Sequence, residues 1–574
     1  MGATITRQRK VTRVAQTAAE LAVPLHTATA SELPLCNVSA LLRDAKPERR
    51  RRITEVMRMA FQPTDDNDRP VVFTRDARRS QYMHDRDVQA ALGAEWVSSE
   101  EEAQHPTAGE VFAFTILEDK HREDGTSFQR RRFIGWPRAH NEWLKRRGYK
   151  ADVPLEHVSA YLHAATDEFA TSADCKVGFW QVEIPRECRR YFRGRTASGR
   201  LFQLSLLCMG QSPSVEIMQF VTEMVSGHPN SINKNMVISD ARHSHTWVDG
   251  FRITAPTRAA TQTIINKIND NARKYSVTLK EPMRVQTRYE FIGVEFDHER
   301  RRVRVAAKTR DKLSKPLPLV TTYGELEQFV GRIIFAAAVH QRPLVLIWFA
   351  LKWVRRRLNW LNKGHDDQGN VIVDKTPCRL SEQRTVWSQL EQARRDLVGW
   401  HSVTKVDGAG DAHLFVDASK FGAGGVLLRP DGTIGVIGRA WKAGETKSFT
   451  DNSDNINICQ LEAKAAGWAV SEMSQQLKKF RTVTLHVDNT SVQAAIKKGN
   501  ARSAAVAHEV ATLVQHMVPS VTWKVTRVAS AENPADGPSR NVFSEFEKMY
   551  KQANEAQKEN VRVGGGARVA FTSL

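Results

Sequence analysis

The sequence predicts a multidomain protein of mixed α/β and α+β class. Its 574 residues correspond to about four domains at roughly 150 residues per domain. Strand-like and helical stretches alternate over 101–300, and helical periodicity dominates 305–360 and 381–400. After the soft segment Val406–Gly410 a strand pattern begins again. We therefore predict a domain boundary near residue 406.

The net charge points to a polyanionic partner. Lys plus Arg number 84 against 64 Asp plus Glu, a formal charge of +20. For a chain this basic nucleic acid is the default partner, the alternative being a generally basic surface. The six cysteines include no C-x-x-C pair, so neither a zinc knuckle nor a disulfide framework is indicated. We expect an intracellular protein, of cytoplasm or nucleus.

Membrane insertion is not expected. The sequence contains no apolar run of 18 residues, and its best stretch, 344–351, is short and flanked by Arg342 and Lys352. The basic N-terminal extension, 1–100, shows no chemistry of its own. Its arginine run Arg49–Arg52 has two readings, contact with phosphate or import machinery, or a solvated helix end.

The C-terminal part reads as three antiparallel strands followed by alternating helices and strands. "HLFVDASKFGAGGVLL" reverses at its glycines, "RPDG" is a turn signal, and "TIGVIGRAW" supplies the third strand. A helix, "CQLEAKAAGWAV", precedes the strand "TVTLHVDN". A further helix leads to the last strand, "VTWKVTRV", and then to "ENPADGPSR".

Four acids stand on these elements: Asp417, Glu462, Asp488 and Asp536. Any one alone is most simply a surface acid. Together they would repel one another unless a cation lay among them. Two Mg²⁺ ions about 3.5–4 Å apart are the usual solution for phosphodiester cleavage. The pattern therefore predicts a metal-dependent nuclease, with Mg²⁺ or alternatively Mn²⁺.

Residues 411–541 resemble the ribonuclease H family of retroelements, a mixed sheet with helices. The resemblance implies that Asp417, Glu462, Asp488 and Asp536 are catalytic metal ligands that cut the RNA strand of an RNA–DNA hybrid. The family's histidine before the last aspartate is missing from "KVTRVASAEN". Arg527 is a candidate substitute.

A second pair of acids lies in the central part. Asp174 ends a strand-like stretch, and Asp249 stands near the tip of the hairpin "HSHTWVDGFRITAP". Thr257 can cap the helix that follows. Residues 115–300 resemble a reverse transcriptase palm. The resemblance implies a right-hand polymerase of fingers, palm and thumb, in which Asp174 and Asp249 are catalytic and metal-binding.

The same resemblance implies binding of an RNA template, a DNA primer, the RNA–DNA hybrid and dNTPs. Phe179 matches the aromatic that excludes a ribose 2′-OH, Gly210 the glycine of the template-grip loop, and Lys280 the lysine before the primer-grip strand "FIGVEFD". Lys120 and Arg131 fall where the triphosphate is held, and arginine suits bidentate phosphate contact.

One position departs from the palm pattern. The Y-x-D-D motif reads Trp247-Val248-Asp249-Gly250, so its second acid is absent. We expect weak metal binding, which an aspartate at 250 would restore, unless glycine is required for a turn with φ > 0. Two rival hypotheses are a ribonuclease whose palm only binds nucleic acid and a non-catalytic nucleic-acid-binding protein.

The ending "PADGPSR", without protease or integrase signatures, is similar to tyrosine-recombinase retrotransposons of the DIRS and VIPER-like groups. The sequence does not determine the oligomeric state. The domains expected are a basic N-terminal extension (1–100), fingers and palm (101–304), thumb-like helices (305–360), a connection (361–405), a ribonuclease H domain (406–545) and a C-terminal tail (546–574).

Overall fold

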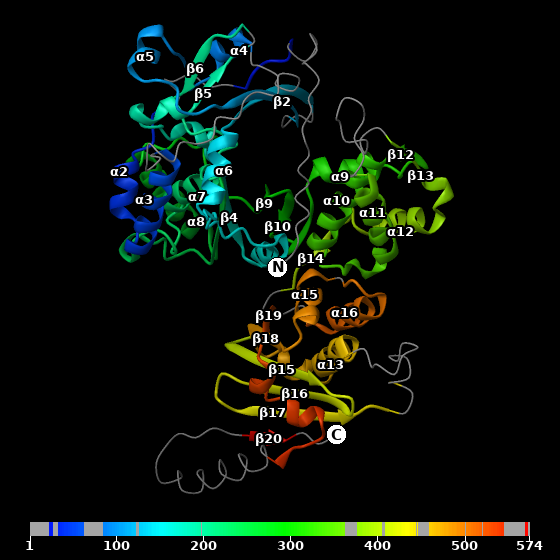
Figure 1. Ribbon diagram of the computed structural model, residues 1–574. Coiled ribbons are helices and arrows are strands. Elements are labelled where there is room, and N and C mark those ends of the chain that lie inside the picture. The colour runs from blue at the N-terminus through cyan, green and yellow to red at the C-terminus, as the bar shows by residue number, and fades with distance from the viewer. Residues whose placement is uncertain are drawn as a thin grey trace.

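The computed structural model describes residues 22–26, 33–61, 84–121, 126–196, 198–361, 376–404, 408–442, 445, 458–499, 501–518, 521–544 and 569–571. Figure 1 shows them as two lobes standing side by side and a third domain below. The mixed, multidomain architecture predicted from the sequence is confirmed.

The first lobe holds three small sheets. A long hairpin pairs β2 (Phe112–His121) with β3 (Ser127–Trp136). A second sheet has the order β4–β8–β7, and a third the order β1–β6–β5. The other elements are α2 (Val38–Asp44), α3 (Pro47–Phe61), α4 (Asp85–Ala90), β1 (Ala94–Trp96), α5 (Ser99–Gln104), α6 (Arg138–Arg146), η2 (Val158–Thr166), β4 (Phe169–Asp174), η3 (Gly178–Gln181), η4 (Arg186–Tyr191), β5 (Arg193–Arg195), β6 (Leu201–Leu204), α7 (Ser214–Val225), η5 (Lys234–Met236), β7 (His243–Trp247), β8 (Gly250–Ala255) and α8 (Arg258–Lys274).

The second lobe packs helices against a four-stranded sheet of order β14–β11–β10–β9. Phe296 and Val303 of this sheet share one buried core with Ile333 of α10 and Leu390 of α12. The helical periodicity predicted over 305–360 is confirmed by three α-helices, which a short strand at 320–322 interrupts. The elements are β9 (Arg288–Phe291), β10 (Val294–Asp297), β11 (Arg302–Val305), α9 (Ala307–Ser314), β12 (Val320–Thr322), α10 (Tyr323–Val339), η6 (Leu344–Ile347), α11 (Trp348–Leu361), β13 (Pro377–Arg379), η8 (Leu380–Glu382), α12 (Arg384–Asp396) and β14 (His401–Ser402).

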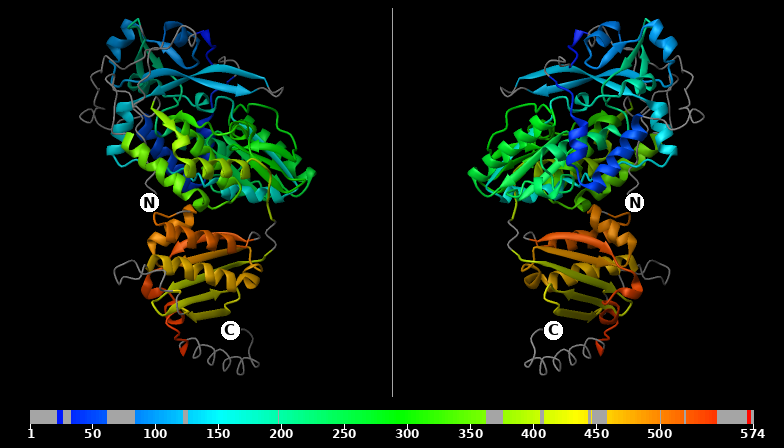
Figure 2. Two further views of the ribbon diagram at one scale, coloured as in Figure 1. Left: turned by 90° about the vertical axis from the view of Figure 1, so that its right-hand side faces the viewer. Right: turned by 90° about the vertical axis from the view of Figure 1, so that its left-hand side faces the viewer.

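The third domain is a six-stranded mixed sheet of order β19–β18–β15–β16–β17–β20. The three predicted antiparallel strands are β15, β16 and β17, whereas β18 runs parallel to β15 and to β19. Figure 2 shows the domain from both sides, below the two lobes. Its elements are β15 (Asp411–Ala418), β16 (Gly422–Leu428), β17 (Ile434–Ala440), α13 (Ile458–Glu472), α14 (Ser474–Leu477), β18 (Thr482–Val487), α15 (Thr490–Lys498), α16 (Ala504–His516), β19 (Thr522–Arg527), η10 (Ser530–Glu532), α17 (Asp536–Ser539) and β20 (Val569–Phe571).

Alternation along the strands separates the two faces of this sheet. Leu427 and Leu485 face the core formed with α13, α15 and α16. Val426 and Val436 face the other way and pack with Ala535, next to α17. The domain is therefore covered by helices on both faces, as α/β domains with parallel strands require.

The sequence "VTLK" (277–280) alternates like a strand, but the segment forms only an isolated bridge, between Leu279 and Cys175. The C-terminal tail contains Val569–Phe571, which pairs in parallel with β17 at the edge of the sheet. The first 19 residues lie outside the described part of the chain. Within that part, the helices lack the length and apolar character needed to cross a bilayer.

The described part of the N-terminal extension packs into the first lobe. Leu41, Ile53 and Val56 are fully buried in the core that also contains the first lobe's strands. The side chain of Arg52 contacts both carboxylate oxygens of Glu216 on α7, at 2.7 and 3.0 Å, and Glu216 is fully buried. Arg52 therefore docks α3 against α7, and a phosphate contact is not supported at this residue.

Removing Arg52 would leave Glu216 buried without its cation. We expect Arg52→Ala to lower the free energy of unfolding by about 3 kcal/mol, the cost of breaking one side of a buried pair. Arg51→Ala is the matched control, because Arg51 is exposed and such changes cost within about 0.5 kcal/mol. Denaturant titration of both variants measures the difference. Equal effects would contradict the docking role.

Candidate active site

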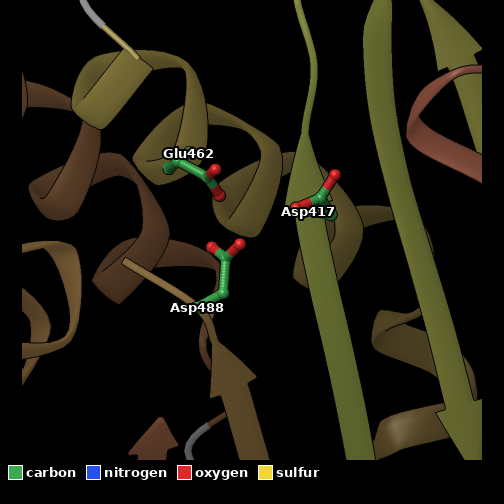
Figure 3. A group of neighbouring side chains, drawn as sticks. All are labelled: Asp417, Glu462 and Asp488. Atoms are coloured by element: carbon green, nitrogen blue, oxygen red, sulfur yellow. The ribbon is translucent and has the colours of Figure 1, made fainter. Parts of the chain in front are cut away.

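Three acids of the third domain meet at one edge of the sheet. Asp417 lies near the end of β15 and Asp488 directly follows β18. Because these strands are parallel neighbours, their carboxyl ends lie together. Glu462 reaches the same point from α13. One ligand oxygen from each acid lies within 4.8 Å of the others, and Figure 3 shows the three carboxylates converging.

Burial and mutual repulsion shift the protonation of these acids. Asp417 is 5% and Glu462 4% exposed. Burial, with the charges of Asp417 and Asp488, raises the pKa of Glu462 to about 9. Burial also raises the pKa of Asp417. Oε2 of Glu462 and Oδ1 of Asp488 are buried without a hydrogen-bond partner in the described residues. Oxygen atoms of this kind suit Mg²⁺ or Mn²⁺.

The fourth predicted acid, Asp536, lies close by but outside this group of three. It begins α17 and forms an ion pair with Arg540 at 3.0 Å, with half of its side chain exposed. Its charge still contributes to the raised pKa of Asp417. Arg540, one turn away, holds the Asp536 carboxylate. Its role as a metal ligand stays a prediction.

Several polar residues that the sequence did not single out position these acids. The Ser530 hydroxyl donates to Oδ2 of Asp488 at 2.8 Å. Asn533 donates to the carbonyl of Val416, beside Asp417, at 3.0 Å. Arg527, the candidate substitute for histidine, reaches the backbone carbonyl of Asp488 at 3.4 Å. It thus flanks the site without contacting a carboxylate oxygen.

The first lobe brings the other two acids together. Asp174 ends β4, and Asp249 stands between β7 and β8. The amide of Cys175 donates to the carbonyl of Asp249 at 2.7 Å, so the strand end and the hairpin tip are adjacent. The predicted hairpin is confirmed. In the described residues a group of three possible ligands occurs only at Asp417, Glu462 and Asp488.

A buried glutamine on α7 holds the hairpin tip. Val248 has a left-handed φ of 57°, which is unfavourable for a β-branched residue. Its amide donates to Oε1 of Gln219 at 2.7 Å, and Nε2 of Gln219 donates to Thr246 at 2.6 Å. Sequence reasoning missed Gln219, because only its tertiary contacts reveal the role. It fixes the turn that presents Asp249.

Gly250 is not required by turn conformation, which corrects one of our two explanations. Its φ lies outside the left-handed region. Gly250 pairs across the sheet with Asp174, and a Cβ added to it would lie 2.6 Å from Oδ1 of Asp174. The glycine therefore leaves room for the Asp174 carboxylate. An aspartate here would restore a ligand only if Asp174 rotated.

The assignment of Arg131 to a triphosphate is wrong for this structure. Its side chain is 3% exposed, and its guanidinium pairs with both oxygens of Asp87, at 2.5 and 2.8 Å. A third nitrogen donates to the carbonyl of Val23 at 2.7 Å. Every side of the fork is thus occupied by protein. Lys120 lies on β2, but its side chain is outside the described part of the chain.

Phe179 and Lys280 lie beside Asp174, whereas Gly210 lies against the β2–β3 hairpin, and the roles of all three stay predictions. Phe179 is 9% exposed in the turn after Asp174. Gly210 has φ 115°, and a Cβ there would meet the carbonyl of Gly135 at 2.7 Å, so only glycine fits against the β2–β3 hairpin. The amide of Lys280 donates to the carbonyl of Asp174 at 2.8 Å, while its ammonium group pairs with Glu281.

Comparison with known protein families identifies the third domain. Residues 407–515 match the family described as "RNase H-like domain found in reverse transcriptase". The third domain is ribonuclease H-like. The match includes Asp417, Glu462 and Asp488 and ends before Asp536. A search of curated proteins gave no match.

Three solved structures of a foamy viral protease–reverse transcriptase are similar over most of the chain. The dRH form with ds DNA has 13% identity and a TM-score of 0.42, covering 87% of this chain and 84% of that chain. The complex with RNA/DNA hybrid has 12% identity and a TM-score of 0.42, covering 89% of this chain and 65% of that chain. The complex with dsDNA has 12% identity and a TM-score of 0.40, covering 88% of this chain and 99% of that chain. These likenesses are too distant to assign an activity to this chain.

The raised pKa of Glu462 makes the stability of metal-free protein depend on pH. Between its ordinary pKa of 4.5 and about 9, the folded state holds a proton that the unfolded state has lost. Stability therefore falls as pH rises through this window. In a chelating buffer, we expect the unfolding temperature to fall from pH 6 to pH 9, and Glu462→Gln to reduce that fall.

The matched control is Glu472→Gln, an exposed position on the same helix, which should behave like the wild type. Added Mg²⁺ should raise the unfolding temperature of the wild type more than that of Glu462→Gln, because a bound ion stabilises only the folded state. Identical pH profiles for wild type and Glu462→Gln would contradict the assignment.

Proposed function

We propose that this chain is a retrotransposon RNA-directed DNA polymerase with ribonuclease H activity on RNA–DNA hybrids. The observation that carries the proposal is the convergence of Asp417, Glu462 and Asp488 at the edge of a ribonuclease H-like sheet. Their crowding costs free energy unless a divalent cation or a proton neutralises it, and carboxylates perturbed in this way cluster at functional sites.

In the nuclease site, the chain's own residues create a partly buried, negatively charged cradle. Mg²⁺ or Mn²⁺ bound there would activate the attacking water and stabilise the leaving oxygen of the RNA strand. Ser530 holds Oδ2 of Asp488, and Asn533 ties the segment before Asp536 to β15. These contacts fix the cradle in advance, which is what positioning of charge in catalysis requires.

In the polymerase site, Asp174 and Asp249 would align a primer 3′-OH with an incoming dNTP. The support is their adjacency across β4 and the hairpin tip and the buried Gln219 that holds the tip. The basic chain, at +20, would hold template, primer and hybrid chiefly through their phosphates.

The alternative function is a ribonuclease H whose palm only binds nucleic acid. Two observations favour it. Gly250 supplies no carboxylate, and the guanidinium of Arg131 is paired with the carboxylate of Asp87. The finer placement among tyrosine-recombinase retrotransposons of the DIRS or VIPER-like groups rests on the sequence "PADGPSR". An intracellular location, cytoplasm or nucleus, is part of the same proposal.

Cleavage of RNA in a hybrid is the direct test. With Mg²⁺ the protein should cut the RNA strand of an RNA–DNA hybrid and leave single-stranded RNA largely intact. Asp488→Asn should reduce the rate at least about a hundredfold, corresponding to roughly 2.7 kcal/mol. Glu472→Gln and Asp174→Asn should cleave normally, because neither lies at the site. Wild-type rates for Asp488→Asn would sink the nuclease assignment.

Extension of a primed RNA template separates the polymerase from the binding-only palm. We expect weak extension that requires high Mg²⁺ or Mn²⁺, because one ligand is missing. Gly250→Ala should lower it about tenfold, or roughly 1.4 kcal/mol, by displacing the Asp174 carboxylate. Gly399→Ala is the control, since a Cβ there meets no atom within 4 Å. Absence of extension by wild type would favour the binding-only palm, and strong extension at low Mg²⁺ would refute the weakened site.

A further inference from the structure

One face of α11 is a stripe of cations. Lys352, Arg355 and Arg356 are spaced i, i+3 and i+4, so they lie on the same side of the helix. Arg355 and Arg356 are exposed. The sequence 344–361 contains no aspartate or glutamate. A charged helix face usually carries both acidic and basic side chains. On this face no acid of the same helix neutralises the three cations.

The N-terminal end of the stripe joins the second lobe to the ribonuclease H-like domain. The indole nitrogen of Trp348 donates to the carbonyl of Ala501 at 3.1 Å. The ammonium group of Lys352 donates to the carbonyl of Arg502 at 2.5 Å. Figure 1 shows α15 and α16, which flank residues 501–502, at the side of their domain that faces the lobes. The segment 491–508 also contains no acid.

Four cations therefore gather at this joint: Lys352, Arg355, Arg356 and Arg502. In the described residues none of the four has a carboxylate within ion-pair distance. Burial, and then the charges of Arg355, Arg356 and Arg502, lower the pKa of Lys352. The free protein thus bears a repulsion that a polyanion would relieve.

The joint is well placed relative to the nuclease acids. The helix α15 begins two residues after Asp488 and has 9 residues, so it is about 13 Å long, and Arg502 follows its last residue, Lys498, by four positions. That length corresponds to roughly four phosphates of one strand at about 3.4 Å each. The joint also lies where α11 of the second lobe contacts residues 501–502 of the domain that contains Asp417, Glu462 and Asp488.

We propose that Lys352, Arg355, Arg356 and Arg502 form a phosphate-binding joint, which holds the backbone of an RNA–DNA hybrid between the lobes and the nuclease site. Identification of the hybrid as the ligand rests on the proposed function. The joint binds nucleic acid independently of base sequence, because its cations contact phosphates and make no contacts with base edges. It also sets the distance between the held backbone and the acids that cut.

Salt dependence of hybrid binding tests the joint without requiring activity. The affinity for a labelled hybrid of about 20 base pairs is measured across NaCl concentrations in a chelating buffer. This hybrid is longer than the span of roughly four phosphates that corresponds to α15. Arg355→Ala/Arg356→Ala should reduce the slope of log affinity against log salt by about 2, close to one per phosphate contact. Arg355→Lys/Arg356→Lys keeps both charges and should retain most of the slope.

The matched control is Lys234→Ala/Lys267→Ala. These two lysines are exposed on η5 and α8, and removing them should leave the slope unchanged. The alanine pair at 355 and 356 should not lower the unfolding temperature of the free protein, because it relieves repulsion. The proposal would be overturned if the Arg355→Ala/Arg356→Ala variant kept the salt slope of the wild type, or if the control lost as much of the slope. It would also be overturned if that variant changed only the sedimentation of the protein. If the wild type failed to cleave the hybrid while the alanine variant still showed a reduced salt slope, the result would count against the proposed nuclease and would leave the phosphate-binding joint supported.

Discussion

Repulsion among two buried carboxylates, Asp417 and Glu462, and the half-buried carboxylate of Asp488 is the constraint around which the third domain is organised. Asp417, Glu462 and Asp488 offer oxygens within 4.8 Å of one another, and the pKa of Glu462 rises to about 9 as a result of burial and its two neighbours. A folded domain tolerates such a cluster because its core supplies the opposing free energy. The parallel pairing of β15 with β18 and the packing of α13 hold the acids in place.

The first lobe meets a milder form of the same constraint. Two acids there share one end of a sheet, and the position where a third would stand is Gly250, opposite Asp174. The space left by that glycine is occupied in part by the Asp174 carboxylate. The site thus has less negative charge to neutralise and fewer oxygens to offer. This difference explains why a nuclease function is the better supported half of the proposal.

The sequence was sufficient where chemistry follows local pattern. Strand alternation, turn residues and helical spacing located Asp417, Glu462 and Asp488, because each stands at the end or on the face of a recognisable element. Pattern failed where a role depends on distant partners. Arg131 forms an ion pair with Asp87, 44 residues away in the sequence. Arg52 forms an ion pair with Glu216, 164 residues away. Gln219 acquires its role only once α7 packs against the hairpin.

Metal binding coupled to proton release examines the carboxylate cluster most directly. Mg²⁺ can be titrated into the protein calorimetrically at pH 8 in two buffers that differ in protonation enthalpy. Because Glu462 is protonated below its pKa of about 9, binding should release about one proton, and the observed heat should depend on the buffer. Asp417→Ala should abolish the binding. Heat that is the same in both buffers, or binding that survives Asp417→Ala, would contradict a metal site at these three residues.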